Sequence, residues 1–275
     1  MSCCCSQSFL LHIDMARIFI TGSSDGLGSL TARALVQRGH SVVLHARNDR
    51  RAHDAAAACP GAETCLVADL SDISQTKKLA EDVNQLGPFD AIIHNAGLYT
   101  GSYQATKGEC PSLTAVNTLS PYILTCLINP PKRLVFISSS LHNSGDASLT
   151  DLTWEHRGER GYRDMQAYCD SKLHMVMLAC AFARRWPGVK SNAIDPGWVP
   201  TKMGGRSATD DIDAAVDTYV MLAEGKGEAE EVSGKYWYQM KTRKCKGAAE
   251  DVNTQDKLLL ELERITGVKA PNHSL

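Results

Sequence analysis

Six short apolar runs that alternate with helix-like stretches constrain this chain more than any other feature of its sequence. The runs are ARIFIT, SVVLHA, TCLVADL, DAIIHNAG, RLVFISSS and VKSNAIDPG. Helical periodicity marks residues 29–39, 73–85, 115–127, 166–185, 212–223 and 255–266. Strands separated by helices form parallel sheets with right-handed crossovers. The pattern predicts an α/β fold, doubly wound, with a mostly parallel central sheet and helices on both faces.

The chain is predicted to be one domain over residues 15–275. Its 275 residues exceed the usual single-domain size, but α/β sheets of this length commonly form one core, and no repeat or Pro/Gly linker divides it. Residues 1–14, MSCCCSQSFLLHID, contain no Lys or Arg and precede a second methionine. This favours an upstream start or a disordered extension over a targeting signal or acylation of Cys3 to Cys5.

Charge and cysteine usage limit the classes of partner. The chain has 29 Lys+Arg against 31 Asp+Glu and no long basic block, which argues against nucleic acid or an anionic membrane as a partner. No apolar run approaches the ~18–20 residues needed to span a bilayer. The cysteines from Cys59 to Cys245 include no C-x-x-C pair, so free thiols are expected and no metal site. We expect a cytoplasmic protein that acts on a small molecule.

A glycine-rich turn joins the first apolar run to the first helical stretch. Its sequence is Thr21-Gly-Ser-Ser-Asp-Gly-Leu-Gly28, with the spacing G-x-x-x-G-x-G. Glycines let a backbone approach a pyrophosphate, and the N-terminus of the following helix offers it free N–H groups and partial positive charge. Three glycines can also be only a turn, but the position between strand and helix predicts a dinucleotide site.

Further motifs follow this turn in a fixed order. Asn95-Ala96-Gly97 comes after the fourth run, Ser138-Ser139 after the fifth and Pro196-Gly197 after the sixth, while Tyr168 and Lys172 form Y-x-x-x-K. Each motif alone is weak. The ordered set resembles the short-chain dehydrogenase/reductase family over residues 17–267. The residues between the motifs resemble those of its daunorubicin C-13 ketoreductase-like and retinol-dehydrogenase-like members. The resemblance implies a single Rossmann domain.

Carried over position by position, the resemblance implies a catalytic tetrad of Asn117, Ser139, Tyr168 and Lys172. Ser139 is the second serine after the strand, although Ser138 and Ser140 remain alternatives. Asn117 would hold a water near the lysine, or could only cap or bridge helices. The cofactor would contact Gly22, Ser24, Asp25, Gly26, Leu27, Gly28, Arg47, Asn48, Asp69, Leu70, Asn95, Ala96, Gly97, Tyr168, Lys172, Pro196, Gly197, Val199 and Thr201.

The residue types in this set fit a proton transfer that accompanies the transfer of a hydride. Tyr168 and Lys172 lie four apart on one helix and therefore share a face. A phenol has an ordinary pKa near 10, and a nearby ammonium is expected to lower it toward working pH. Ser139 would donate to the substrate oxygen as negative charge develops there. Lys172 would also bind the nicotinamide ribose, as the resemblance implies.

The end of the second apolar run predicts which dinucleotide is used. An NAD enzyme usually carries an acidic residue here to accept hydrogen bonds from the ribose, but this chain has Ala46. Arg47 follows, and a guanidinium can bind a 2′-phosphate. Asp25 argues for the alternative, an ordinary solvated arginine, and Asp49 could also swing into the ribose site. We expect NADP(H), with NAD(H) less favoured.

The sequence thus predicts an NADP(H)-dependent oxidoreductase that moves a hydride between the nicotinamide and a ketone, aldehyde or alcohol, with Tyr168 as general acid/base. The alternative is a catalytically silent dinucleotide-binding regulatory protein, but the filled tetrad favours the enzyme. Residues 99–108, 139–168 and 198–215 are expected to build the substrate pocket. Trp154, Trp198 and Met203 would line it or pack as core. The apolar helix at 166–185 would be buried in a homodimer or inside the chain.

Overall fold

The structure is a computed structural model that describes residues 15–101, 103 and 110–272, so the predicted leader at residues 1–14 lies outside the described residues. Eight strands form one sheet in the order β3-β2-β1-β4-β5-β6-β7-β8. Neighbouring strands are parallel except for the antiparallel pair β7 and β8. The strands are β1 Arg17–Ile20, β2 Ser41–Ala46, β3 Thr64–Val67, β4 Ala91–His94, β5 Arg133–Ile137, β6 Lys190–Asp195, β7 Tyr236–Tyr238 and β8 Lys241–Arg243.

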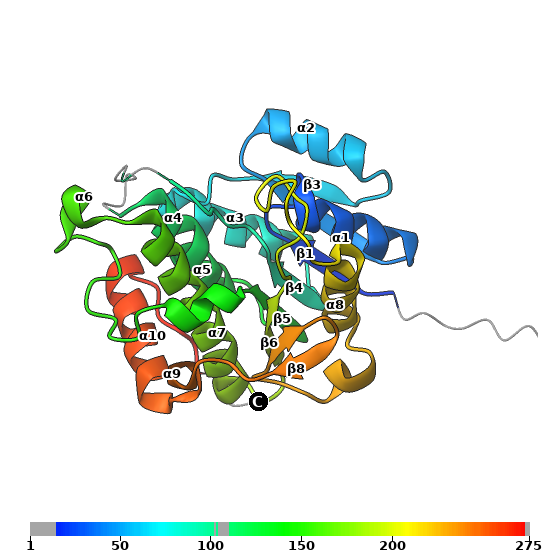
Figure 1. The fold of residues 1–275 in the computed structure, drawn as a ribbon. Coiled ribbons are helices and arrows are strands. Elements are labelled where there is room, and N and C mark those ends of the chain that lie inside the picture. The colour runs from blue at the N-terminus through cyan, green and yellow to red at the C-terminus, as the bar shows by residue number, and fades with distance from the viewer. Residues whose placement is uncertain (1–14, 102, 104–109, 273–275) are drawn as a thin grey trace, which may run out of the picture.

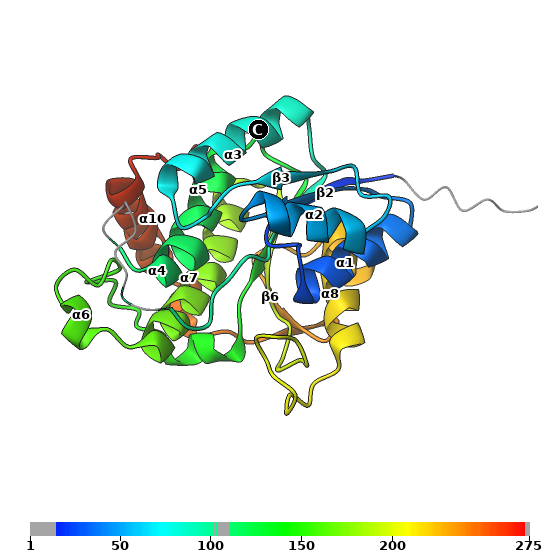
Figure 2. The ribbon, with the colours of Figure 1, turned by 90° about the horizontal axis from the view of Figure 1, so that it is seen from above.

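Helices cover both faces of this sheet (Figure 1). On one face lie α1 Gly26–Gln37, α2 Asp49–Ala58 and α8 Ile212–Glu224; on the other lie α3 Ile73–Leu86, α5 Ser120–Leu127, α7 Asp164–Arg185 and α10 Val252–Thr266. Successive strand residues point to opposite faces, so Ile18 and Ile20 join the first core and Phe19 joins the second. The view from above separates the same two layers (Figure 2). The predicted doubly wound Rossmann fold is confirmed.

The strand order places a crevice where the site is expected. The chain moves outward from β1 to β3, then returns to the other side of β1 and continues through β4, β5 and β6. Ligands of such sheets bind outside the carboxyl ends of the strands at the point where the order reverses. Here that point lies between β1 and β4, which are followed by the glycine turn and by Asn95.

Short elements fill the connections between these layers. They are α4 Ser112–Thr114, the π-helical turn η1 Ala115–Leu119, the 3₁₀ turn η2 Ser140–Ser144, α6 Gly158–Gly161, the 3₁₀ turn η3 Gly227–Glu230 and α9 Gly247–Glu250. Because α4, η1 and α5 follow one another without a break, the helix predicted at residues 115–127 begins earlier and contains a widened turn.

Two parts of the fold were absent from the sequence prediction. The first is α2, whose Asn48 cap accepts a hydrogen bond from the Arg51 N–H at 3.0 Å. The second is the β7–β8 hairpin. Its turn places Gln239 and Met240 at φ +47° and +63°, a left-handed conformation that Asn and Gly favour. With neither residue type in the turn, the sequence carried no hairpin signal.

The long helix α7 is covered within this chain. Its residues from Ala167 to Phe182 are buried, and it packs against β5 and β6 on one side and against α9 and α10 on the other. Of the two explanations for its apolar sequence, the structure therefore supports intramolecular core. In the part of the chain that the structure describes, no helix is both long and apolar enough to cross a membrane.

Candidate active site at the carboxyl ends of the strands

The glycine turn after β1 is built so that side chains would not fit. A Cβ on Gly22, which has φ +62°, would lie 2.8 Å from the Ala96 Cα. A Cβ on Gly28 would lie 2.4 Å from the Asn95 Nδ2. Gly26 also has a positive φ and begins α1, where half-buried Leu27 follows it. The turn therefore places bare backbone at the N-terminus of α1, as a pyrophosphate site requires.

His45 supports this turn from beneath, a role that the sequence did not predict. The Gly22 N–H donates to its Nδ1 at 3.0 Å, so Nε2 carries the proton and donates to the Ala68 carbonyl at 3.0 Å. Burial lowers the pKa of His45 to about 4. The ring is therefore neutral at physiological pH and fixes the turn to the end of β3. A polar residue inside the apolar run SVVLHA was the signal for it.

The residues after β4 lock the same turn from the other side. Asn95 Nδ2 donates to the carbonyl oxygens of Thr21 and Gly22, each at 3.0 Å. The Ala96 N–H donates to the Thr21 hydroxyl at 3.0 Å. These contacts hold the Asn-Ala-Gly motif against the glycine turn, so the two motifs form one rigid floor at the point where the strand order reverses.

The segment after β6 folds over the turn (Figure 1). Gly197, at φ +81°, starts it, and a Cβ there would lie 2.5 Å from the Asp210 carboxylate, which accepts from the Trp198 N–H at 2.7 Å. Thr201 lies 3.9 Å from the Cβ position of Gly26. Val199, which lies between Gly197 and Thr201 in the sequence, is buried. Of the residues predicted here to contact the cofactor, which are Pro196, Gly197, Val199 and Thr201, the structure thus places Thr201 next to the glycine turn.

A charged cluster surrounds Asp25 at the rim of this site. Arg51 Nη2 donates to the Asp25 carboxylate at 2.6 Å and to the Ser24 hydroxyl at 3.0 Å. Lys202 Nζ donates to the same carboxylate at 3.0 Å. Arg47, the residue predicted to bind a 2′-phosphate, follows β2 and is exposed. Arg51 was missed because α2 was missed; its first turn brings the arginine back toward the glycine turn.

Other residues that were predicted to contact the cofactor make hydrogen bonds within the protein or pack in its core. Asn48 caps α2. Asp69 accepts from the N–H and hydroxyl of Ser71 at 2.9 and 2.7 Å, which shapes the loop after β3. Leu70 is buried in the core. The side chains of Asn48 and Asp69 therefore each use one oxygen for hydrogen bonds within the protein.

The three consecutive serines after β5 differ in surroundings. Ser138 is buried and its hydroxyl donates to the Lys172 backbone carbonyl at 2.7 Å, which ties β5 to α7. Ser140 is exposed. Ser139 is half-buried, and its hydroxyl lies within hydrogen-bonding reach of the Tyr168 phenol. Of the three, Ser139 is therefore the one placed to share a substrate oxygen with Tyr168.

The surroundings of Tyr168 correct one expectation. Burial, followed by the negative charge of Asp195, raises the pKa of the phenol above its ordinary value, and the hydrogen bond with Ser139 opposes this. The expected lowering by Lys172 is wrong for this arrangement, because the ammonium donates at 2.9 Å to the Ile137 carbonyl. Its Nζ lies 5.3 Å from the Tyr168 ring centre. At neutral pH the phenol therefore holds its proton and can act as an acid.

Lys172 and Asn117 meet around Gly97. A Cβ on Gly97 would lie 3.6 Å from both the Lys172 Nζ and the Asn117 Oδ1. Burial lowers the pKa of the Lys172 ammonium to about 8. The Asn117 amide spans to the strand end after β4, since it accepts from the Leu98 N–H at 2.7 Å and donates to the Leu98 carbonyl at 2.8 Å. The structure thus brings all four tetrad positions to one end of the sheet.

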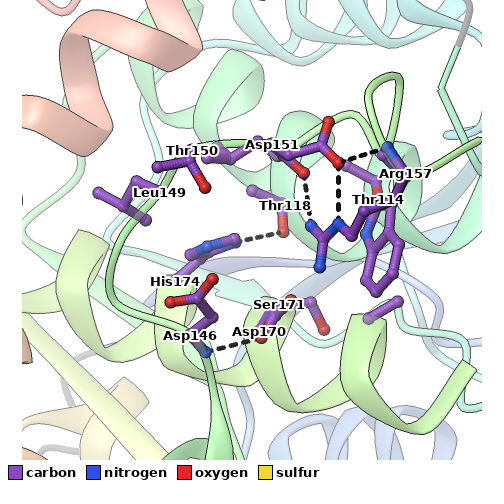
Figure 3. A pocket seen from close by; sticks show the side chains of 13 residues that line it. Thr114, Thr118, Asp146, Leu149, Thr150, Asp151, Arg157, Asp170, Ser171 and His174 are labelled. Atoms are coloured by element: carbon purple, nitrogen blue, oxygen red, sulfur yellow. Dashed lines mark hydrogen bonds and ion pairs between the residues drawn. The ribbon is translucent and has the colours of Figure 1, made fainter. Parts of the chain in front are cut away.

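A polar pocket lies beside α7, with Asp170, Ser171 and His174 of that helix in its wall (Figure 3). In it Arg157 pairs with Asp151, and the backbone N–H of Asp146 donates to Asp170. It is lined by Thr114, Thr118, Asp146, Leu149, Thr150, Asp151, Leu152, Trp154, Arg157, Ala167, Asp170, Ser171 and His174. Residues 146–157 therefore border this pocket, and Trp154 among them packs in one buried cluster with Tyr162 and Tyr168.

The three residues predicted to wall the substrate pocket divide between two roles. Trp154 is 3 % exposed and packs as core beneath the Arg157 guanidinium, which lies 3.5 Å from its ring centre. Trp198 and Met203 are half-exposed on the segment that folds over the site. Tyr99, the first residue of the predicted segment at 99–108, packs edge-to-face on Tyr168, with the two ring centres 4.8 Å apart. Most of the remaining predicted segment at 99–108 lies outside the described residues.

The profile of a known family matches most of the chain. The family described as enoyl-(acyl carrier protein) reductase aligns with residues 22–244. The short-chain dehydrogenase chyC of Penicillium rubens is 46 % identical over 260 residues, which cover 94 % of this chain and all of that protein. The chain is a member of the short-chain dehydrogenase/reductase family. Its membership accounts for the sheet, the glycine turn and the Y-x-x-x-K helix together.

A more distant relative and a solved structure are also similar to this chain. Retinol dehydrogenase 13 of Homo sapiens is 28 % identical over 93 % of this chain and 86 % of its own length. The Pseudomonas aeruginosa RhlG/NADP active-site complex superposes with a TM-score of 0.62 at 22 % identity, over 81 % of this chain and 94 % of that one. The family is one of oxidoreductases that use NAD(P), and this chain belongs with them.

Proposed function

We propose that this protein reduces ketones or aldehydes with NADPH, and that Tyr168 delivers the proton. The observation that carries the proposal is the position of the phenol: Tyr168 lies between Ser139 and Lys172 and its raised pKa keeps it protonated at neutral pH. A protonated phenol is an acid suited to a forming alkoxide. The reverse reaction, alcohol oxidation, would use the same residues with the phenol deprotonated.

Each residue of the tetrad has a proposed task. Ser139 donates a hydrogen bond to the substrate carbonyl oxygen and so stabilises the charge that develops there. Tyr168 protonates that oxygen. Lys172 holds the ribose through its ammonium, and Asn117 fixes the strand end beside it. When bound, the nicotinamide dinucleotide supplies the hydride.

The residues around the glycine turn fit a dinucleotide. The glycines of this turn place bare backbone at the start of α1, where a helix N-terminus can bind a pyrophosphate, and the close packing of Gly22 against Ala96 and of Gly28 against Asn95 holds that backbone in place. Preference for NADPH is supported by Arg47 and Arg51 at the rim and by Ala46 in place of an acid. The NADP named with the RhlG structure is consistent with this choice.

The substrate would enter beside half-exposed apolar side chains. Met165, Trp198 and Met203 are each about half-exposed, and Tyr99 contacts Met165. Apolar surface at a site entrance favours substrates with an apolar body around the carbonyl. The polar pocket beside α7 is not offered as part of this site, because Arg157 pairs with Asp151 and the carboxylates of Asp146 and Asp170 accept hydrogen bonds within the protein.

The test is a spectrophotometric assay of NADPH oxidation with a panel of aliphatic, aromatic and cyclic ketones and aldehydes, in parallel with NADH. We expect turnover of at least one apolar carbonyl, faster with NADPH. NADPH binding without turnover of any carbonyl or oxidation of any alcohol by NADP⁺ would favour the silent regulatory protein instead. Faster turnover with NADH at every concentration would contradict the cofactor assignment.

A further inference from the structure

A buried carboxylate lies beside the proposed tetrad and has no role in it so far. Asp195 is the last residue of β6 and is 7 % exposed. One of its oxygens accepts from the Gly197 N–H at 2.9 Å, and the other accepts from the Tyr236 hydroxyl at 3.0 Å. An ionised group at such depth requires compensation, by hydrogen bonds and by a charge of opposite sign. The two hydrogen bonds fix its position and leave the charge to be balanced.

The strand register places that charge beside Lys172. Ile194 pairs with Ile137 between β6 and β5, and the Ser138 N–H donates to the Ile194 carbonyl at 2.7 Å. The Lys172 ammonium donates to the carbonyl of the same Ile137. Asp195 therefore follows directly after the strand position opposite the ammonium's acceptor. The negative charge of Asp195 raises the pKa of the Lys172 ammonium and so opposes the effect of burial.

The other groups that face Asp195 carry no positive charge at neutral pH. Burial lowers the pKa of His142 and raises that of the tyrosines around the carboxylate, and Lys246 faces His142 from the far side. The groups that interact with the Asp195 charge are Tyr168 and Lys172 of α7, Tyr219 of α8, Tyr236 and Tyr238 of β7 and His142 of η2. Lys172 is the one cation among them.

We propose that Asp195 is a positioning residue that supplies the counter-charge of the buried Lys172 ammonium. The inference rests on the proposed function, since it assigns the tuning of the same site. The carboxylate favours the ammonium form of Lys172 and disfavours the phenolate of Tyr168. Both effects extend, toward higher pH, the range in which the lysine is charged and the tyrosine is an acid.

The test is the pH dependence of two quantities in Asp195→Asn and in a matched control. NADPH affinity is followed by quenching of tryptophan fluorescence, and kcat/KM for carbonyl reduction by NADPH oxidation. Asparagine keeps the shape and the acceptor for the Gly197 N–H but removes the charge. We expect the alkaline limb of both profiles to move about one pH unit lower. Tyr236→Phe removes a hydrogen bond but no charge, so its limbs should stay near those of the wild type.

Each other outcome has a definite reading. Limbs of Asp195→Asn that coincide with those of an active wild type would overturn the inference and leave the proposed function intact. An equal shift in Tyr236→Phe would assign the effect to structure and would also overturn it. A wild type that binds no NADPH would overturn the proposed function and the inference with it. If Asp195→Asn does not fold, Asp195→Ser, which keeps a small acceptor, is held to the same criterion.

Discussion

The two ends of the proposed site hold their charges in opposite ways. At the phosphate end, Arg51 and Lys202 pair with Asp25, and the side chains are 21 %, 80 % and 46 % exposed. At the proton-transfer end, Lys172 and Asp195 are buried. Water and salt screen the first group, so its pairs contribute little to stability and exchange partners readily. The second group is screened far less, and a change of one charge there alters the protonation of its neighbours.

This difference suggests a division of labour. Exposed pairs can open, so Arg51 can leave Asp25 when a 2′-phosphate offers it a better acceptor. Buried charges cannot be re-paired, so they set fixed protonation states around Tyr168. We therefore expect substitutions at the buried end to change the rate and its pH dependence, and substitutions at the exposed end to change which cofactor binds.

The largest effect is expected for Tyr168→Phe, which removes the transferable proton from the buried end. We expect turnover to fall by about a thousandfold, or about 4 kcal/mol, with NADPH affinity unchanged. Steady-state kinetics and fluorescence titration of NADPH measure the two quantities. Tyr99→Phe makes the same change on the ring next to it and should keep turnover within a few-fold. Turnover near the wild-type rate in Tyr168→Phe would remove the acid assignment.

A smaller effect is expected when acid protonates His45 beneath the glycine turn. The ordinary pKa of about 6.5 applies to the unfolded chain, whereas burial holds the pKa near 4 in the folded protein. Between these values the unfolded chain binds a proton that the folded chain does not. The free energy of unfolding should therefore fall as the pH drops from about 6.5 to about 4, by up to about 3 kcal/mol from this site.

Chemical denaturation across this pH range measures the slope. The other buried histidines, His94 and His174, also have lowered pKa values and add slopes of their own, so the test compares proteins with and without His45. His45→Asn should show a shallower pH dependence, and the exposed His156→Asn should not. Equal slopes in all three proteins would mean that His45 does not titrate as its burial indicates.

The smallest effect is expected at the exposed end. Arg51→Ala should raise the KM for NADPH about tenfold, or about 1.4 kcal/mol, and leave that for NADH unchanged. High salt should reduce the difference, because it screens the interaction with the phosphate. Arg50, exposed on the same helix turn, provides the control as Arg50→Ala. If Arg47→Ala alone reproduced the whole effect, the 2′-phosphate would belong to Arg47, as the sequence predicted.

Sequence patterns were sufficient where local chemistry determines local structure. The glycine turn, the six strands and the Y-x-x-x-K face follow from spacing, and the structure forms them where they were predicted. The β7–β8 hairpin was not predicted, because Gln239 and Met240 adopt a left-handed turn that contacts with the rest of the fold must stabilise. Helix α2 was not predicted, because its alanine-rich sequence has little apolar periodicity. Ala55 is the residue that it buries.

The electrostatics of the site were the least predictable part. Whether Lys172 lowers the pKa of Tyr168 depends on where its ammonium points and on how deeply both groups are buried. Its acceptor, the Ile137 carbonyl, lies 35 positions away in the sequence, and Asp195 comes from another strand. Spacing along one helix placed Tyr168 and Lys172 on the same face but carried no information on these distant partners.

The hydrogen bonds of Asn117 have a consequence for how this sheet ends. Its amide accepts from the N–H and donates to the carbonyl of Leu98, the pair of bonds that a neighbouring strand would supply. The π-helical turn at Ala115–Leu119 thus provides the chain after β4 with a hydrogen-bonding partner one side chain long. Aspartate could not imitate a peptide group in both directions. The Leu98 backbone, which follows the Gly97 that faces Lys172, is therefore aligned as a neighbouring strand would align it, and loss of the Asn117 amide would remove both of these hydrogen bonds.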